Sequence, residues 1–440
     1  MDHKGSQFVK IKRKSNQCYG SFLKALKICL NISVEPILFL VLFSNSLRAI
    51  SNVTLTMEMV CSAEKNYSDE ICKNFLYDEK YTKEKIIIQQ SANNWGIINT
   101  IVTVLPAMFI NLLAGPWSDK YGRKLPLFFP IFGQFISTVF LIAIVYTDYK
   151  FSPYVIVLAH ISSGITGSYL TLLIAFSYIA DITTHESRSI KFIFVEGVIM
   201  LGNPLGNLLA GYVHKLYGFG PVYIISAVCL VIALIYGMVF LKETQGIGVK
   251  DSWKTRVKYF FNLKTLRESL RACYRARPQN KRKILICLLL SMLSFVFFIN
   301  LENSVAYMYG QLAFNWNQWT FSIFQSSTSS TSLIFTMAIA PILTYILKIP
   351  DVYIGIFGTI SGIVSVIIMG IAQSTVLFYI GGFVGMFQSL IPPLLRACIT
   401  KIVDADEIGK IFALLTSLEF ATPILASTIK VVYDQITMKS

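Results

Sequence analysis

The sequence predicts an all-α polytopic membrane protein with two pseudo-symmetric helix bundles. Its composition and the length of its apolar runs predict the membrane helices. Of the 440 residues, 54% are hydrophobic and only 14% are charged, and the mean hydropathy is +0.59. A soluble domain of this length would expose a very large apolar surface to water. The apolar residues also form runs of roughly 20 or more, the length that a helix needs to cross the hydrocarbon core of a bilayer.

Eleven apolar runs are long enough to be membrane spans. They cover residues 35–56, 91–114, 125–147, 153–180, 191–213, 221–241, 284–309, 319–347, 351–371, 374–399 and 410–433. Six precede a basic segment and five follow it. This predicts a tail at 1–34, a six-helix bundle at 35–241, a linker at 242–283, a five-helix bundle at 284–433 and a short tail at 434–440.

Two bundles of six spans each would contain twelve spans, so this count is one helix short. We therefore expect the chain to be truncated or to have lost its twelfth span, so that its carboxyl terminus lies on the lumenal side. The alternative is a twelfth crossing hidden in a wrongly divided run, although the apolar stretch at 259–263 in the linker is far too short to cross.

The basic residues predict the orientation of the spans. The net charge of +15 does not indicate a nucleic-acid polymer as partner, because Lys and Arg lie in gaps between apolar runs. The linker carries 13 Lys and Arg against 3 Asp and Glu, and the amino-terminal tail is basic as well. Loops rich in Lys and Arg remain in the cytosol. We expect a cytosolic amino terminus, with no cleaved signal peptide before the first span.

The segment 57–90 is predicted to be a loop on the opposite, extracellular or lumenal side. It contains Asn66 in an Asn-Tyr-Ser acceptor pattern for N-glycosylation. Only Cys61 and Cys72, of the eight cysteines, share this oxidising compartment, so we expect them to form a disulfide. Two free thiols in a mobile loop are the alternative.

The segment 115–124 reads Gly-Pro-Trp-Ser-Asp-Lys-Tyr-Gly-Arg-Lys. Gly115 and Gly122 permit a tight turn, Asp119 can accept from the amino end of a neighbouring helix, and Arg123 can pair with a carboxylate across the interface between the halves. A generic basic loop would explain only the lysines. The arrangement resembles the GxxSDxxGRR/K signature of the major facilitator superfamily, which implies the major facilitator fold and a gating role for this segment.

Several segments together resemble the proton-coupled folate transporter family. They are Val34-Glu35-Pro36, the segment 115–124, Ser177-Tyr178-Ile179-Ala180-Asp181, Phe194-Val195-Glu196 and Pro392-Pro393-Leu394-Leu395-Arg396. The resemblance implies transport of anionic organic solutes, folate-like, muropeptide-like or nucleotide-like, across plasma or endolysosomal membranes, with functional roles at Glu196 and Arg396. An acidic residue and a histidine of the folate transporter are replaced here by about Gly167 and Phe298, which argues against folate and the usual proton relay.

Ionisable side chains inside spans are costly, so they usually face a cavity or a partner. Four are candidates for the substrate or proton pathway: Glu196, Arg396, Glu419 and His160. Each has a structural alternative: helix-start electrostatics for Glu196, an interfacial anchor for Arg396, pairing between helices for Glu419 and ordinary packing for His160. Glu35 and Glu302 lie near span ends and are expected to be solvated.

Two uncharged features of the spans remain open to more than one interpretation. The segment 202–206, Gly-Asn-Pro-Leu-Gly, is close to a GPxxG element of proton antiporters, and plain small-residue packing explains it equally well. The polar stretch 325–332 could line a wet cavity or bond to other helices.

The function that we expect is secondary transport of a small organic anion, driven by a proton gradient as a symport. The alternative is a proton antiporter that exports a drug-like or metabolite cation. An enzyme is not expected, since only His160 of four histidines lies in a span and no catalytic cluster is visible. No metal site, cofactor or nucleotide-binding loop is expected either. The sequence leaves the oligomeric state open.

Overall fold

The computed structural model describes residues 32–75, 79–147, 151–184, 187–262, 271, 275, 280–314, 316, 318–404 and 407–437, and within these ranges all regular structure is helical. The first half contains α2 (Glu35–Met59), η1 (Val60–Glu64), α3 (Asp69–Asn74), η2 (Glu79–Tyr81), α4 (Thr82–Tyr121), α5 (Lys124–Val145), α6 (Tyr154–Ile165), α7 (Leu170–Ile182), α8 (Arg188–Tyr217), α9 (Phe219–Phe240) and α10 (Trp253–Phe260). The second half contains α12 (Lys281–Phe314), α13 (Gln318–Pro341), η4 (Ile342–Ile346), α14 (Asp351–Gly370), α15 (Thr375–Val384), η5 (Gly385–Leu390), α16 (Ile391–Ile402) and α17 (Ile408–Thr437). The predicted all-α class is confirmed.

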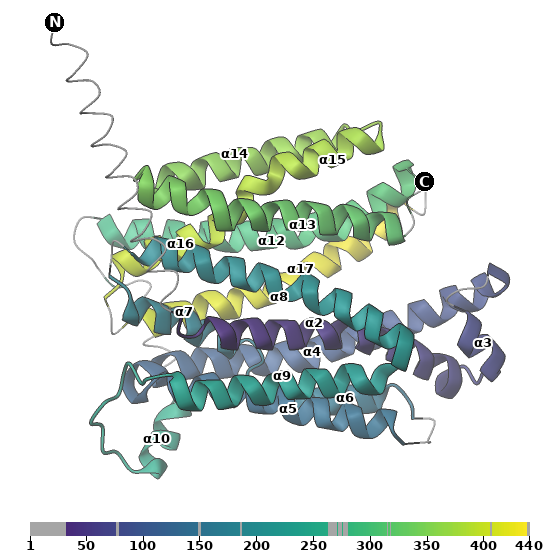
Figure 1. The fold of residues 1–440 in the computed structure, drawn as a ribbon, viewed down its shortest axis with the longest axis horizontal. Helices are drawn as coiled ribbons and strands as arrows, with labels where there is room; N and C mark the ends of the chain where they lie inside the picture. Colours follow the sequence, from purple (N-terminus) through teal and green to yellow (C-terminus); the bar gives the residue numbers. More distant parts are fainter. Residues whose placement is uncertain are drawn as a thin grey trace, which may run out of the picture.

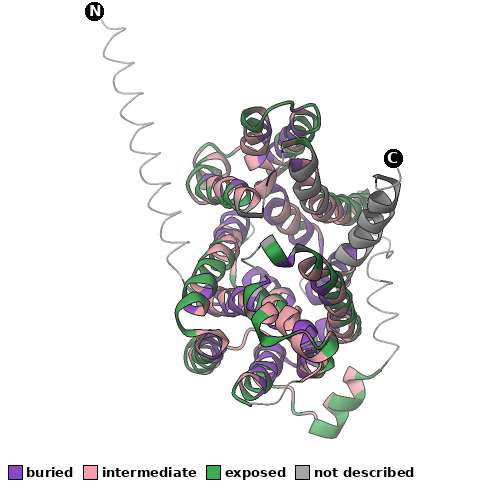
Figure 2. Ribbon diagram, turned by 90° about the vertical axis from the view of Figure 1, so that its right-hand side faces the viewer, coloured by how far each residue is buried: buried purple, intermediate pink, exposed green. Residues whose placement is uncertain are grey.

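The long helices run side by side in two groups (Figure 1). We call one end of the molecule the basic end, where Lys120, Arg123 and α10 lie, and the other the disulfide end, where Cys61 and Cys72 lie. Seen along the helices, buried residues face inward and exposed residues face outward (Figure 2). The two groups meet along α4 with α17 and along α8 with α13 and α16.

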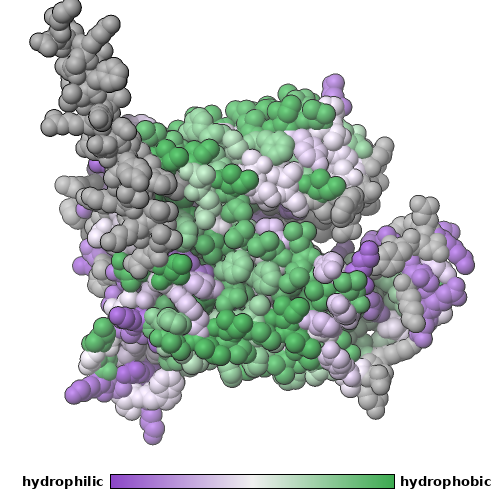
Figure 3. All heavy atoms as spheres, in the orientation of Figure 1, coloured by the Kyte–Doolittle hydropathy of each residue, from purple (hydrophilic) through white to green (hydrophobic). Residues whose placement is uncertain are grey.

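A broad apolar belt crosses the middle of the face seen in Figure 3, and polar side chains gather at its two ends. Within the described residues, 10 helical segments are long and apolar enough to cross a membrane. Large apolar side chains point outward on these segments, among them Phe140 and Phe298. Such a surface is stable only in lipid. The eleventh predicted span, 410–433, falls within α17.

The last helix of the first bundle, α9, packs against α2 and α5. The Ser44 and Ser226 hydroxyls lie 2.7 Å apart across the α2 contact, and Gly237 sits against Ile37 and Phe128. In the second bundle, α12 and α14 occupy the places in the chain order that α2 and α5 occupy in the first. The space between them is an apolar groove of about 1300 Å³ that includes the half-buried Glu302. This groove lies on the outer flank of the bundle.

The predicted span 153–180 corresponds to a membrane-length segment at Tyr154–Ile182, but its helix is interrupted at its centre. Gly167 has φ +77°, which the right-handed helix cannot accommodate, and it separates α6 from α7. A similar change occurs in the second bundle, where the 3-10 segment η5 separates α15 from α16. Gly, Ser and Thr at these breaks are ordinary in apolar helices, so hydropathy alone did not locate them.

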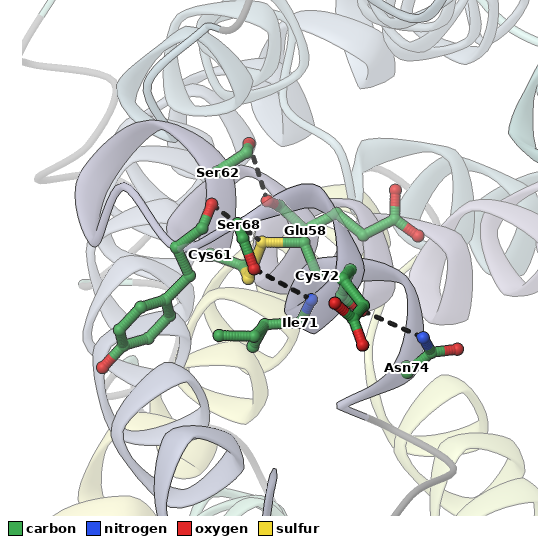
Figure 4. Close-up of a disulfide and its surroundings, with 9 residues drawn as sticks. Glu58, Cys61, Ser62, Ser68, Ile71, Cys72 and Asn74 are labelled. Atoms are coloured by element: carbon green, nitrogen blue, oxygen red, sulfur yellow. Dashed lines mark hydrogen bonds between the residues drawn. A yellow bond between two sulfur atoms is a disulfide. The ribbon is translucent and has the colours of Figure 1, made fainter.

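The segment 57–90 is largely helical, so the prediction of a loop is wrong there. The helix α2 extends to Met59, continues as the π-helical turn η1 and is followed by α3, while α4 already begins at Thr82. A disulfide joins Cys61 to Cys72, with the Cα atoms 5.7 Å apart (Figure 4). Ser68 caps α3 by accepting from the N–H of Ile71, as the dashed line in Figure 4 shows. Asn66 is exposed in the turn between η1 and α3, with φ +51°.

We predict that Cys72→Ser will destabilise the segment from η1 to α4, because the disulfide restricts the unfolded chain. A closed loop of this size contributes about 2 to 3 kcal/mol. The measurement is thermal unfolding of the purified protein, together with mass spectrometry of alkylated cysteines without reduction. Cys287→Ser, which removes an exposed free thiol, is the matched control. Alkylation of both Cys61 and Cys72 in the unreduced wild-type protein would contradict the prediction.

Candidate functional site

The segment 115–124 is not a loop. The helix α4 continues to Tyr121, Gly122 adopts φ +117° and α5 begins at Lys124. Only Gly122 therefore makes the predicted turn, and the expectation for Gly115 is wrong. Gly115 lies inside α4, where a Cβ atom would collide with the carbonyl group of Gly409 on α17. Its missing side chain instead allows α4 and α17 to approach closely at the basic end.

Asp119 joins the two bundles at this contact. Its Oδ1 accepts a hydrogen bond of 3.1 Å from the backbone N–H of Gly409, one residue into α17. The amino end of a helix offers unsatisfied N–H groups and a positive dipole, so a carboxylate there is stabilised. The predicted role of Asp119 as an acceptor from a neighbouring helix agrees with this geometry.

Arg123 does not pair across the bundles, contrary to expectation. Its side chain is completely buried and contacts Asp119 at 2.6 Å and Asp181 at 3.0 Å, both in the first bundle. Glu243 accepts from the backbone N–H of Arg123 at 2.6 Å and of Lys124 at 3.1 Å, and so satisfies the start of α5. We call Asp119, Arg123, Asp181 and Glu243 the latch. A buried guanidinium needs this many partners, because an unpaired charge in the interior is very costly.

A second set of contacts closes the basic end on the other side of the interface. The guanidinium of Arg188 on α8 donates to the Thr400 carbonyl on α16 at 2.8 Å. Asp351, the first residue of α14, accepts from Ser189 on α8 at 2.8 Å and pairs with Lys401 at 2.5 Å. Asp351 therefore reaches across to the first bundle as Asp119 reaches across to the second, which is a partial internal repeat of the latch.

Three of the four predicted pathway residues meet between the bundles. Arg396 on α16 contacts Glu196 on α8 at 2.9 Å and Glu419 on α17 at 3.4 Å. Their side chains are between 8% and 15% exposed. We call these residues the central triad. Two carboxylates share one guanidinium, so the triad has one negative charge in excess when both carboxylates are ionised.

Aromatic rings border the central triad. The guanidinium of Arg396 lies over the ring of Phe176 on α7, 4.3 Å from its centroid, a cation–π contact. Phe176 packs in turn against Phe192 and Phe412 on the side of the basic end. Tyr169 and Phe420 stack across the bundles on the other side. These rings restrict water around the triad, which strengthens its charge interactions.

His160 lies in a different network, within the first bundle. Its Nδ1 is 2.8 Å from the Ile156 carbonyl oxygen, which can only accept, so Nδ1 carries the proton. Its Nε2 is 3.1 Å from the Asn52 amide nitrogen, and Asn52 accepts from the Tyr223 hydroxyl at 2.8 Å. Every polar atom here is satisfied with a neutral imidazole. The geometry favours the packing role for His160, and its place in a proton pathway stays a prediction.

Sequence reasoning missed Arg48, a buried cation in the middle of α2. Its guanidinium donates to Gln134 Oε1 at 3.0 Å and to Thr138 Oγ1 at 3.2 Å, both on α5. The contacts that the structure shows for Arg48 are hydrogen bonds to neutral groups, and no ion pair is among them within the described residues. An arginine at the centre of a predicted span was the available signal.

Glu35 was expected to be solvated, and this is wrong. Glu35 is 3% exposed and forms an ion pair with Lys191 on α8, which is also buried. Both residues lie near span ends at the basic end, where packing of α2 against α8 covers them. The burial of a pair that lies far apart in the sequence is a tertiary effect that hydropathy does not report.

The two uncharged features are resolved differently. Gly202 and Gly206 of the segment 202–206 lie against the backbone of α2 at Phe43, so this element packs helices together. In the stretch 325–332, the hydroxyls of Ser327, Thr328 and Thr331 bond back to carbonyls of their own helix. Several other members of the stretch are exposed.

Comparison with known proteins places the fold. Residues 39–427 match the family described as Major Facilitator Superfamily. The chain belongs to that superfamily. Its members are membrane transporters, and the predicted major facilitator fold is confirmed.

Relatives of known function are similar over most of the chain. A Drosophila melanogaster protein named probable peptidoglycan muropeptide transporter SLC46 is 27% identical, over 90% of this chain and 79% of its own length. The Gallus gallus lysosomal proton-coupled steroid conjugate and bile acid symporter SLC46A3 is 26% identical, over 91% and 87%. The Bos taurus proton-coupled folate transporter is 23% identical, over 90% and 84%. The resemblance to this family is thereby confirmed.

Solved structures show the same fold. The human organic anion transporter MFSD10 superposes with a TM-score of 0.68 at 16% identity, covering 90% of this chain and 92% of its own. The proton:xylose symporter XylE superposes with a TM-score of 0.65 at 14% identity, covering 94% and 90%. The family match and the membrane-length helices together make this chain an integral, multi-pass membrane transporter.

We predict that Gly115→Ala will disfavour closure of the basic end, because the new methyl group would collide with the Gly409 carbonyl. Overpacking of this kind costs about 1 to 3 kcal/mol, so the ratio of closed to open molecules should fall at least about fivefold. Pulsed electron-spin distances between the basic ends of α4 and α17 measure it. Gly96→Ala on the same helix, where a Cβ meets nothing within 4 Å, is the matched control and should leave the distances unchanged.

Asp119→Asn should slow transport while the folded protein remains abundant. The amide oxygen can still accept from Gly409, but the charge beside Arg123 is lost, and a charged hydrogen bond is worth about 1.5 to 3 kcal/mol. Arg123 keeps Asp181 as a partner, so folding should survive. The measurement is the initial transport rate per folded molecule. A wild-type rate would show that the carboxylate does not set the balance between the state closed at the basic end and the state open there.

Proposed function

We propose that this protein couples inward proton movement to the transport of a small organic anion bound at the central triad. The observation that carries the proposal is the single guanidinium of Arg396 held between carboxylates from both bundles. Glu196 belongs to the first bundle and Glu419 to the second. Transporters built from paired bundles bind cargo at the midplane between them.

The charge balance of the triad supplies a coupling mechanism. With both carboxylates ionised, Arg396 is fully engaged and the site is negative, so an organic anion is repelled. A proton on Glu196 or Glu419 removes one competitor, and one side of the planar guanidinium becomes available to a carboxylate, sulfate or phosphate group of the cargo. An excess charge in a water-poor site is costly, so proton and anion favour each other's binding. No bound cofactor enters this mechanism.

The functions in the names of the relatives support the cargo class. They name muropeptide, steroid conjugate and bile acid, and folate, and carboxylate or other anionic groups are common to such compounds. We also propose that the basic end faces the cytosol, because the linker carries 13 basic residues against 3 acidic ones. The membrane would then be the plasma membrane or that of an endolysosomal compartment.

Export of a cation by proton antiport is the alternative, and the excess carboxylate is the observation that favours it. A cationic cargo would take the place of the proton on the second carboxylate. The glycines at 202 and 206 no longer add support, since they pack against α2. The two mechanisms predict opposite responses to acidification on the cargo side: faster anion entry for symport and slower cation binding for antiport.

Uptake of labelled organic anions into proteoliposomes at mildly acidic and at neutral outside pH tests the proposal. We expect faster uptake at acidic pH, and we expect Glu196→Gln or Glu419→Gln to reduce this dependence. Arg396→Lys keeps the charge but loses the planar fork, so the half-saturation concentration should rise about tenfold, as for the loss of about 1.4 kcal/mol. Arg282→Lys at the exposed start of α12 is the matched control.

Normal anion uptake across pH by both Arg396→Ala and Glu196→Gln would exclude the triad as the coupling site. Acid-inhibited transport of an organic cation, with no uptake of anions, would favour the antiport alternative.

A further inference from the structure

The short helix α10 in the linker has two different faces. One face docks on the first bundle. The indole N–H of Trp117 on α4 donates to the Arg256 carbonyl at 3.1 Å, the Tyr259 ring meets the Tyr121 ring edge-on, and Phe260 packs against the apolar core. These contacts hold α10 in one orientation at the basic end.

Asp251, two residues before α10, fixes the same orientation. Its carboxylate accepts from the Tyr121 hydroxyl at 2.8 Å and pairs with Lys120 at 3.5 Å. The hydrogen bond from Tyr121 and the charge of Lys120 keep the pKa of Asp251 below its usual range. The contact therefore persists throughout the neutral and mildly acidic pH range, and α10 remains docked.

A neighbouring face of α10 is apolar and, among the described residues, uncovered. Trp253 is 62% exposed, Val257 is 38% exposed and Phe261, at the carboxyl cap, is 65% exposed. Four-residue spacing places such side chains on one side of a helix. Lys254 and Lys258 each follow one of these residues, so they flank the apolar face on one side, and both are exposed. A shallow depression is formed by these five side chains.

The position of α10 bears on what can lie against this face. In Figure 1, α10 lies below α9 and α5 at the basic end, and in Figure 2 the same helix lies outside the ring of long helices. It therefore projects sideways from the bundle. The lipid-facing surface of α9 ends at the same level, with Val239 and Phe240 both more than 60% exposed. A bilayer that surrounds α9 places its headgroup region next to α10.

We propose that α10 is an interfacial helix that binds anionic phospholipid. Trp253, Val257 and Phe261 enter the boundary between headgroups and acyl chains, and Lys254 and Lys258 bind the phosphate and carboxylate groups of the headgroups. Tryptophan and phenylalanine favour this boundary, and flanking lysines add attraction to anionic lipid. This inference does not depend on the cargo or on proton coupling.

The docked face of α10 connects lipid binding to the latch. Tyr121, which holds Asp251 and Tyr259, precedes Gly122 and Arg123 directly. Lipid headgroups that hold α10 at the membrane surface therefore also hold the end of α4, which carries Asp119 of the latch.

Fluorescence of the full-length protein in lipid vesicles tests the proposal. The difference in emission between wild type and Trp253→Phe isolates the signal of Trp253. Phosphatidylserine and phosphatidylcholine with brominated acyl chains serve as quenchers at matched ionic strength. We expect both lipids to quench Trp253. Half-quenching should need a lower mole fraction of phosphatidylserine than of phosphatidylcholine.

Lys254→Ala/Lys258→Ala should raise that mole fraction toward the value for phosphatidylcholine, since each lysine near an anionic surface contributes about fivefold. Lys83→Ala/Lys215→Ala, which removes two exposed lysines at the disulfide end, is the matched control and should change nothing. Circular dichroism of each variant verifies folding.

Three outcomes would overturn the proposal. Trp253 emission that neither lipid quenches would place α10 in water or under another protein segment. Equal quenching by both lipids in the wild-type protein would remove the anionic preference. Loss of the preference on adding inorganic phosphate, with ionic strength held constant by chloride, would indicate a site for a free anion rather than a lipid surface.

Discussion

The structure depends on the requirement that each buried charge has a partner of opposite sign or a sufficient number of dipoles. Arg123 illustrates this most completely. Its side chain has no exposed surface, and the two aspartates around it belong to α4 and α7, so these helices cannot separate without exposing an unpaired guanidinium to a medium of low polarity. The first bundle is held together at the basic end by this requirement, and the Oδ1 atom of Asp119 that contacts Arg123 also accepts from the backbone N–H of Gly409 on α17.

The same requirement gives the central triad a different character. Around Arg123, both carboxylates of the ion pairs belong to the first bundle, so a relative movement of the bundles does not separate them from the guanidinium. Around Arg396, one cation serves two carboxylates that belong to different bundles, so any relative movement of the bundles changes which carboxylate is satisfied. A site whose partners lie in different bundles responds when the bundles move or when a proton or an anion binds, whereas the ion pairs of Arg123 stay within one bundle.

Much of this could be predicted from the sequence, because bilayer thickness and charge placement act on short stretches of chain. The spans, the signature at 115–124 and the cysteine pair depend on local patterns of this kind. The partners of Arg123 and the burial of Glu35 could not be predicted, because they depend on which helices become neighbours. The approach of Glu419 to Arg396 was also invisible, although each residue could be selected separately as a costly charge in a span. Arg48 was predictable by the same rule, since a charge inside the first span carries the same signal.

The contact between Asp119 and Gly409 unites a side chain in one bundle with a backbone N–H in the other. Almost any amino acid offers that N–H, but a Cβ at position 409 would collide with the Asp119 carboxylate, so space rather than hydrogen bonding demands glycine there. Compensating exchanges of paired side chains cannot arise at such a contact. Methods that infer proximity from correlated substitutions among homologous sequences would find an unvarying glycine and overlook the point at which the two bundles engage.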